Sequence, residues 1–264
     1  MGLNVMVGIP AYNEESAIES VIAGSIPHAT SVIVVDDGSS DQTSAFALRA
    51  GATVIRHTRN SGKGLAVATL FDYAIKEHAD ILVLLDGDGQ HDPDEIPRLV
   101  NRCLDQNVDV VVGSRFRRGS SSDTPHIRRV GQLVFNTLTH IASGVPCSDS
   151  QSGFRAFSRR AICAMRLSEV SFSVESEMQF ECRARSLTLD EVPISCKYNS
   201  PPKRNVLSHG MIVLAGLVTM ALKRRTLHHN PEFALPQAQR TVLQSSRSGD
   251  GQIFNPAIWN TPGD

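Results

Sequence analysis

Residues 81–97 read ILVLLDGDGQHDPDEIP, an uninterrupted apolar run that ends in a cluster of acidic residues. A short apolar run of this kind is typical of a strand buried on both faces of a parallel sheet. Asp86 and Asp88 follow it two positions apart, so in extended backbone both carboxylates point the same way. Hard oxygen ligands suit Mg²⁺ or Mn²⁺. The stretch therefore predicts a metal site at Asp86 and Asp88, with Gln90, next in the alternation, as a third ligand.

This stretch also allows two other interpretations. A calcium-binding loop is excluded, because the position that requires glycine is His91 and the position that requires glutamate is Pro97. A turn whose Asp and Gly residues only terminate the strand is the remaining alternative to the metal site.

Four further apolar runs resemble this strand, and helical patterns lie between them. The runs are NVMVGI (4–9), SVIVVDD (31–37), ATVIRH (52–57) and VDVVVGS (108–114). Helix-like spacing occurs near 14–24, 41–50, 64–77, 93–106 and 127–143, and residues 153–195 read as strand, helix and strand. Asp41 (or Ser40) and Asp92 are plausible starts for two of the helices. The alternation predicts an α/β fold with a mostly parallel sheet, whose ligands bind beyond the carboxyl ends of the strands.

Polar side chains follow the first two runs at the positions where such ligands bind. Tyr12 is suited to stacking on a base and Glu14 to pairing with a ring N–H, whereas a helix start is the alternative for Glu14. Asp37 is suited to accepting hydrogen bonds from ribose hydroxyls or a base edge, with a capping turn as its alternative.

Cationic side chains follow later in the chain. RNSGKG (59–64) is not a phosphate-binding loop of the P-loop type, because His57 and Gly64 stand where that motif needs Gly and Ser or Thr. Its glycines still allow close approach of a ligand, so Lys63 is predicted to contact a phosphate or a base. Arg115 and Arg128 are predicted to bind phosphate oxygens, since a guanidinium makes forked contacts with them.

The composition is that of an ordinary soluble protein. Among 264 residues, 26 Lys and Arg balance 27 Asp and Glu, which argues against nucleic-acid binding. The five cysteines are odd in number and form no CxxC pair, which favours a reduced, cytoplasmic compartment.

The C-terminal part divides at about residue 226. One domain is expected over 1–226, followed by a disordered tail over 227–264 that is rich in Pro, Gln, Ser, Asn and Gly. The apolar run 206–222 is shorter than the roughly 20 residues of a membrane-spanning helix, so no transmembrane span is expected. It is expected to form an amphipathic helix that lies at a membrane surface or closes the sheet.

The motifs taken in order resemble family 2 glycosyltransferases with a GT-A (Rossmann-like) fold. More narrowly, they look like the dolichol-phosphate mannosyltransferase-like, or polyprenyl-phosphate glycosyltransferase, branch. The similarity covers about residues 4–220. The motifs are IPAYNEE (9–15), VVDDGSSDQT (34–43), NSGKG (60–64), LDGDGQHDP (85–93), GSRF (113–116), DSQSGFRAFSR (149–159) and EVPIS (191–195).

The resemblance assigns a role to individual residues. Nucleotide contacts are implied for Pro10, Tyr12, Glu14, Val35 and Asp37. A metal and diphosphate site is implied for Asp86, Gly87, Asp88 and Gln90, Gly87 standing where relatives often have Ala. Arg115 is expected at the donor or acceptor phosphates and Arg128 at the acceptor phosphate.

Three features depart from the usual family pattern. Gln132 stands where relatives often have Ser, and Asn199 and Asn205 stand where they usually have a basic pair. Lys203 and Arg204 lie nearby and are candidates to replace that pair in binding the donor. No C-terminal transmembrane helices are expected, although many relatives have them.

The resemblance implies a metal-dependent, inverting transfer from a nucleotide sugar (GDP-mannose, or UDP-glucose or UDP-GlcNAc) to a polyprenyl phosphate such as dolichyl or undecaprenyl phosphate. The nucleotide-binding half is expected at about 1–113, the acceptor-binding half at about 114–226, and the enzyme in the cytoplasm or on the cytoplasmic membrane face. The alternatives are a hydroxyl or small-molecule acceptor, with Glu177 as base, and a non-catalytic nucleotide-sugar binding protein. Sugar-phosphate nucleotidyltransfer is disfavoured, because Ala-Tyr-Asn-Glu-Glu (11–15) replaces the Gly-rich segment that it needs.

Overall fold

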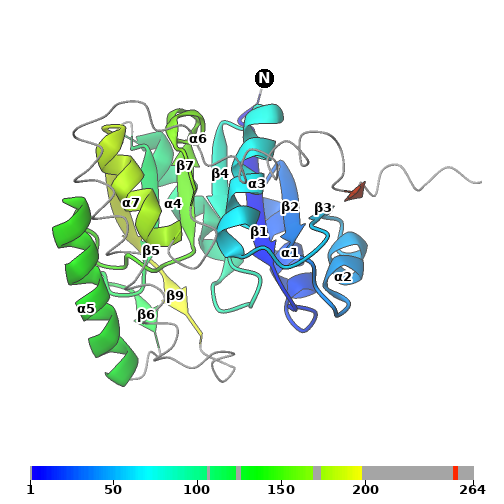
Figure 1. Cartoon of the computed structure of the whole chain (residues 1–264), viewed down its shortest axis with the longest axis horizontal. Coiled ribbons are helices and arrows are strands. Elements are labelled where there is room, and N and C mark those ends of the chain that lie inside the picture. Colours follow the sequence, from blue (N-terminus) through cyan, green and yellow to red (C-terminus); the bar gives the residue numbers. More distant parts are fainter. Residues whose placement is uncertain (1, 106–107, 123–125, 169–173, 198–251, 255–264) are drawn as a thin grey trace, which may run out of the picture.

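An eight-stranded sheet forms the centre of the molecule (Figure 1). The computed structural model describes residues 2–105, 108–122, 126–168, 174–197 and 252–254. The strands lie in the order β10-β3-β2-β1-β4-β7-β5-β8, and β6 pairs separately with β9. Their bounds are β1 Val5–Ala11, β2 Ser31–Asp36, β3 Thr53–Arg56, β4 Ile81–Leu84, β5 Val110–Ser114, β6 Ser121–Ser122, β7 Arg155–Ser158, β8 Leu189–Pro193, β9 Ser195–Cys196 and β10 Gln252–Phe254.

Strand direction brings distant parts of the chain to one edge of the sheet. The pairs β1–β2, β1–β4, β2–β3 and β5–β8 are parallel, whereas β7 runs antiparallel to both β4 and β5. Arg155, at the start of β7, therefore pairs with Leu84 at the end of β4 and with Val112 in β5. As a result, the segment that precedes β7 lies at the edge where β4 and β5 end.

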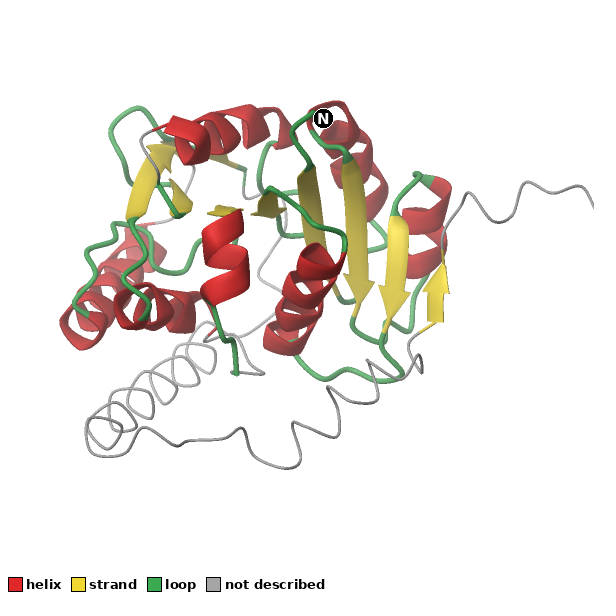
Figure 2. Cartoon of the chain, turned by 90° about the horizontal axis from the view of Figure 1, so that it is seen from above, coloured by secondary structure: helices red, strands yellow, loops and turns green. Residues whose placement is uncertain are grey.

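Helices cover both faces of the sheet (Figure 2). Val5, Val7 and Ile9 of β1 pack with α1, α2 and α4, while Met6 packs on the opposite face in a cluster with α3, α6 and α7. Each such fully buried side chain contributes about 1.5–3 kcal/mol. The helix bounds are α1 Ile18–Ser25, η1 Ile26–His28, α2 Thr43–Arg49, α3 Lys63–Lys76, η2 Pro93–Glu95, α4 Ile96–Leu104, α5 His126–Ser143, α6 Arg159–Ala164 and α7 Val174–Ala184.

The predicted α/β fold with a mostly parallel sheet is confirmed, and each of the five predicted helices overlaps an observed one. The Asp92 carboxylate accepts a hydrogen bond from Asp94 N–H at 3.1 Å and caps η2. The Asp41 carboxylate accepts from Thr43 N–H at 3.0 Å, although Gln42 occupies the N-cap of α2. The prediction of one helix within 153–195 was wrong. Both α6 and α7 lie there, and the six residues of α6 are too few to show a periodicity.

The C-terminal predictions fall largely outside the described residues. These include the amphipathic helix over 206–222 and most of the tail over 227–264. Within that tail, β10 pairs antiparallel with β3. None of the helices in the described part of the chain combines the length and apolar character needed to cross a membrane.

Candidate active site

The loops after β1 and β2 are held together by hydrogen bonds between side chains and backbone. Asn13 N–H donates to Ser39 Oγ at 2.9 Å, and the Asn13 side-chain oxygen accepts from Ser40 N–H at 2.9 Å. Glu14 N–H donates to Thr43 Oγ1 at 2.8 Å. The polar residues of these two motifs therefore serve first to fix the loops at one edge of the sheet.

The predicted nucleotide contacts in these loops differ in accessibility. Pro10 and Glu14 are half-buried, and Tyr12 is 39% exposed, so a ligand can reach all three. Val35 is paired with Pro10, but its side chain is completely buried in the core on the α3 face of the sheet. The whole residue is inaccessible here, so contact of Val35 with a ligand stays a prediction.

Asp37 is almost completely buried and shapes the loop that precedes α3. Its carboxylate accepts hydrogen bonds from Gly62 N–H at 2.7 Å and from Ser61 N–H at 3.0 Å. It also lies 2.8 Å from His57 Nδ1. The carboxylate is thus engaged within the protein, and direct contact of Asp37 with a nucleotide stays a prediction.

Asp86 and Asp88, which follow β4, have different surroundings. The Asp88 carboxylate is half-buried and accepts from Gln90 N–H at 3.0 Å. Asp86 Oδ1 lies 2.7 Å from Lys63 Nζ. Burial acts to raise the pKa of Asp86, but the positive charge and hydrogen bond of Lys63, together with other nearby groups that include Arg115, hold that pKa below its usual value. Asp86 is therefore a carboxylate at neutral pH.

Lys63 joins Asp86 to a second carboxylate. Its Nζ lies 2.6 Å from Glu175 Oε1, so the first residue of α3 is tied both to the end of β4 and to α7. Burial acts to lower the pKa of Lys63, but Asp86 and Glu175 together raise it above its usual range. Lys63 was predicted to contact a phosphate or a base, and here it binds two carboxylates. Sequence reasoning missed Glu175, because nothing in SVESEMQF distinguishes it from Glu177.

A small pocket beside Asp86 is lined by Pro10, Lys63, Glu175 and Gly153, among other residues. Gly153 approaches Asp86 very closely. A Cβ at position 153 would lie 2.2 Å from Asp86 Oδ2, so only glycine fits there without displacing the carboxylate.

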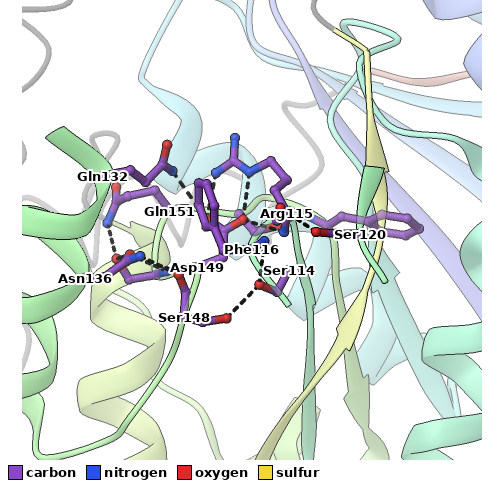
Figure 3. Close-up of polar contacts among 12 residues, drawn as sticks. Ser114, Arg115, Phe116, Ser120, Gln132, Asn136, Ser148, Asp149 and Gln151 are labelled. Atoms are coloured by element: carbon purple, nitrogen blue, oxygen red, sulfur yellow. Dashed lines mark hydrogen bonds and ion pairs between the residues drawn. The ribbon is translucent and has the colours of Figure 1, made fainter. Parts of the chain in front are cut away.

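Arg115 is bound by a carboxylate that the sequence analysis did not single out (Figure 3). Its Nε and Nη2 donate to the two oxygens of Asp149, both at 2.7 Å, and its backbone N–H donates to the same carboxylate at 3.0 Å. Gln132, the residue that departs from the family pattern, also donates to Asp149, at 3.3 Å. Asp149 lies before β7, and the antiparallel direction of that strand brings it to the end of β5.

The remaining predicted residues are only partly described. Glu177 is 7% exposed and accepts from Ser168 N–H at 2.9 Å and Ser168 Oγ at 2.7 Å, so it does not lie on a solvated helix face. Arg128 lies in the first turn of α5, and its side chain is outside the described part of the structure. Lys203 and Arg204 lie outside the described residues.

His91 is a further buried residue of this region that sequence reasoning missed as a site residue. Its ring lies 5.5 Å from that of Phe154, centroid to centroid, and burial lowers its pKa to about 4. His91 Nδ1 has no hydrogen-bond partner among the described residues. The imidazole is consequently neutral at pH 7.

The donor chemistry of the loop after β4 fits a divalent cation with few protein ligands. Asp88 and Gln90 supply half-buried hard oxygens, and Asp86 shares its carboxylate with Lys63. Within the described residues, no three His, Cys, Asp or Glu side chains gather closely enough to hold a metal ion by themselves. The residues thus fit an ion such as Mg²⁺ or Mn²⁺ that takes further ligands from water and a bound phosphate.

Comparison with known proteins assigns the chain to a family. The model of glycosyl transferase family 2 matches residues 6–164, which include both the carboxylates after β4 and the Arg115–Asp149 pair. The chain belongs to glycosyl transferase family 2. The predicted family and enzyme class are thereby confirmed.

This glycosyltransferase is similar to lipid-phosphate enzymes. It is 32% identical over 211 residues to the UDP-N-acetylglucosamine–dolichyl-phosphate N-acetylglucosaminyltransferase of Methanococcus voltae, covering 72% of this chain and 84% of that protein. It is 30% identical over 203 residues to the polyprenol monophosphomannose synthase of Mycolicibacterium smegmatis, covering 72% and 76%.

A solved structure supports the GT-A fold of this glycosyltransferase. The glucosyl-3-phosphoglycerate synthase of Mycobacterium tuberculosis, in complex with Mn²⁺, UDP-glucose and phosphoglyceric acid, superposes with a TM-score of 0.66 at 25% identity. The match covers 83% of this chain and 80% of that one.

Proposed function

We propose that this glycosyltransferase moves a sugar, with inversion at the sugar carbon, from a nucleotide sugar to a polyprenyl phosphate, using Mg²⁺ or Mn²⁺. One observation carries the proposal. The carboxylates after β4 and the guanidinium of Arg115 stand at the same sheet edge, close enough for Arg115 to help lower the pKa of Asp86. An edge with both anionic and cationic groups suits a donor diphosphate on a cation beside a second phosphate.

The residues at this edge have different proposed roles in binding the cation, the nucleotide and the phosphate groups. Asp88, with Asp86 and Gln90, would hold the cation, which when bound supplies positive charge that offsets the negative charge growing on the departing diphosphate. Tyr12 and Glu14 are accessible on the neighbouring loop and would meet the nucleotide. Arg115 would hold a phosphate oxygen of the donor or of the acceptor.

The proposed acceptor is supported by the surroundings of Glu177, the residue considered as a base for a hydroxyl acceptor. A phosphate monoester has a second pKa of about 6 and is mostly dianionic at neutral pH, so it attacks without losing a proton to the enzyme. A hydroxyl acceptor needs a base, and the carboxylate of Glu177 is buried and bound to Ser168. Arginines that bring two anionic groups together are then more useful than a base. The names of the archaeal and mycobacterial relatives support the same acceptor class.

The proposal also concerns the identity of the nucleotide-sugar donor and the contact of the protein with a membrane. One relative is named for N-acetylglucosamine and another for mannose, so both UDP and GDP sugars are candidate donors. A polyprenyl acceptor resides in a membrane, and we propose peripheral contact with its cytoplasmic face, with the run 206–222 and its Lys-Arg-Arg end as the contacting segment.

The test is to incubate the protein and Mg²⁺ or Mn²⁺ with UDP and GDP sugars and a short polyprenyl phosphate, and to search for glycosylated lipid by mass spectrometry. A metal-dependent product that Asp88→Ala abolishes is expected. Asp94→Ala is the matched control, because that carboxylate lies on the same segment but is 84% exposed. Metal-dependent release of nucleotide without a lipid product would retain the glycosyltransferase but contradict the lipid acceptor, and phosphorylated small molecules would be tested next.

A further inference from the structure

We propose that Asp149 is a positioning residue that fixes the guanidinium of Arg115, and that Glu191 holds the segment that carries Asp149. The inference rests on the proposed function, in which Arg115 binds a phosphate group. Neither carboxylate was singled out by the sequence pattern, and Asp149 contacts Arg115 directly (Figure 3).

The contact between Arg115 and Asp149 fixes both ends of the arginine. Asp149 is completely buried, and the side chain of Arg115 is 11% exposed. Nε and Nη2 make a forked pair with the two carboxylate oxygens, while the backbone N–H of Arg115 donates to the oxygen that also binds Nε. Because the backbone and the side chain share one anchor, the plane of the guanidinium has little freedom to rotate.

A second layer fixes Asp149 itself. Glu191 Oε1, from β8, accepts hydrogen bonds from Ser148 N–H at 2.8 Å, Ser148 Oγ at 2.8 Å and Asp149 N–H at 3.3 Å. On the other side, Asn136 Oδ1, from α5, accepts from Ser150 N–H at 2.9 Å. The residues before and after Asp149 are thus held by two different elements. An isolated ion pair between Arg115 and Asp149 would form without this additional support.

Fixing the side chain of Arg115 in advance has an energetic reason, namely the conformational freedom of an arginine side chain. A free arginine side chain has many rotamers, and it loses that freedom when it closes on a phosphate. If Asp149 orders Arg115 during folding, this cost does not fall on substrate binding. Small displacements of a group that binds the reacting phosphate cost as much as about 100-fold in rate, so the orientation matters for turnover.

Asp109 offers a matched control at the opposite end of the same strand. It lies just before β5, is 4% exposed, and accepts from Arg160 Nη1 at 2.6 Å and Thr188 N–H at 2.9 Å. Asp149→Asn and Asp109→Asn therefore remove equally buried carboxylate charges from arginine partners, and only the first lies at the reaction edge.

The experiment measures the melting temperature, kcat and KM of the two Asn variants, of Arg115→Ala and of the double variant Arg115→Ala/Asp149→Asn. Both Asn variants are expected to lower the melting temperature. Only Asp149→Asn is expected to lower kcat/KM, by about 100-fold, through kcat as well as through KM for the phosphate that Arg115 binds. In the Arg115→Ala background, the same change is expected to cost less than about threefold, since there is no guanidinium left to position.

Several results would overturn the inference. These are an Asp149→Asn loss no larger than that of Asp109→Asn, a full additional loss in the Arg115→Ala background, or an Arg115→Ala variant as active as the wild type. If Asp149→Asn does not fold, Asp149→Glu takes its place, because it retains the charge but shifts the guanidinium, and the same loss is expected.

Failure of the proposed function is recognised separately, as a wild type that makes no glycosylated lipid. The coupling between Asp149 and Arg115 is then read from the affinity for UDP and GDP with Mn²⁺. In that case the two single variants are expected to weaken binding by the same factor as the double variant. Independent effects of the two changes would overturn the inference.

Discussion

At the scale of single residues, two glycines near the carboxylates after β4 have opposite tolerance for a side chain. A Cβ at Gly153 would lie 2.2 Å from Asp86 Oδ2, whereas a Cβ at Gly87 would lie 3.3 Å from its nearest neighbour, a methyl group of Ile9. We therefore expect Gly153→Ala to displace the Asp86 carboxylate and to reduce transfer by about 100-fold. Steady-state kinetics with saturating metal measures this effect.

Gly87→Ala is the matched control for that prediction, since it adds the same methyl group one position from Asp86. Ile9 needs to move by only a few tenths of an ångström to accommodate it. The variant should retain activity within about threefold. Equal losses in the two variants would show that the loop tolerates no added methyl group at all, and the specific role of the Gly153–Asp86 approach would be abandoned.

At the scale of elements, Lys63 connects three of them, since it begins α3 and binds Asp86 after β4 and Glu175 in α7. Breaking a buried ion pair by removing one partner costs about 3–5 kcal/mol, because the remaining charges are left without compensation. We expect Lys63→Met to lower the free energy of unfolding by about this amount at pH 7. Urea denaturation in the presence of EDTA measures it. Lys76→Met, at the other end of α3, is the control and should have almost no effect, because Lys76 is 68% exposed.

The same ion pairs give this effect a pH dependence. The pKa of Asp86 is lowered in the folded protein, so its stabilising effect is present above about pH 4 and is lost as the pH falls through the folded value. The pKa of Lys63 is raised, so its effect is present below about pH 10 and is lost only at higher pH. The deficit of Lys63→Met should therefore be largest between these limits and shrink on acidification. A deficit that stays constant as the pH falls from 7 to below the folded pKa of Asp86 would contradict the assignment of Lys63 to these carboxylates.

The sequence could predict the elements, but only part of the site they build. Asp86, Asp88 and Arg115 come directly after buried strands, and parallel strands end at a common edge, so their location follows from local pattern. Asp149 and Gly153 reach that edge because β7 runs antiparallel, and a buried strand has the same apolar pattern in either direction. Asp37 was ambiguous for another reason, since the position after a strand does not reveal whether a carboxylate meets a ligand or the N–H groups of a neighbouring loop.

At the scale of the whole molecule, the cysteines report on how completely the two core layers exclude solvent. All five are free, and only Cys163 is exposed. Burial raises the pKa of Cys103 and of Cys182 to about 12, so neither is a thiolate at pH 8. The native protein should therefore show one thiol that reacts rapidly with DTNB at pH 8, and all five should react in denaturant.

Cys163→Ser tests the assignment, because it should remove the rapid phase and leave the slow one unchanged. The slow thiols lie in different layers, Cys103 with α4 on one face of the sheet and Cys182 with α7 on the other. Both layers share the same strands, so their exposure should require opening of the sheet and its helices as one unit. If so, the slow thiols react with a single rate constant. Two well-separated slow rates would instead mean that one helical layer opens without the other, and that the domain is not one cooperative unit.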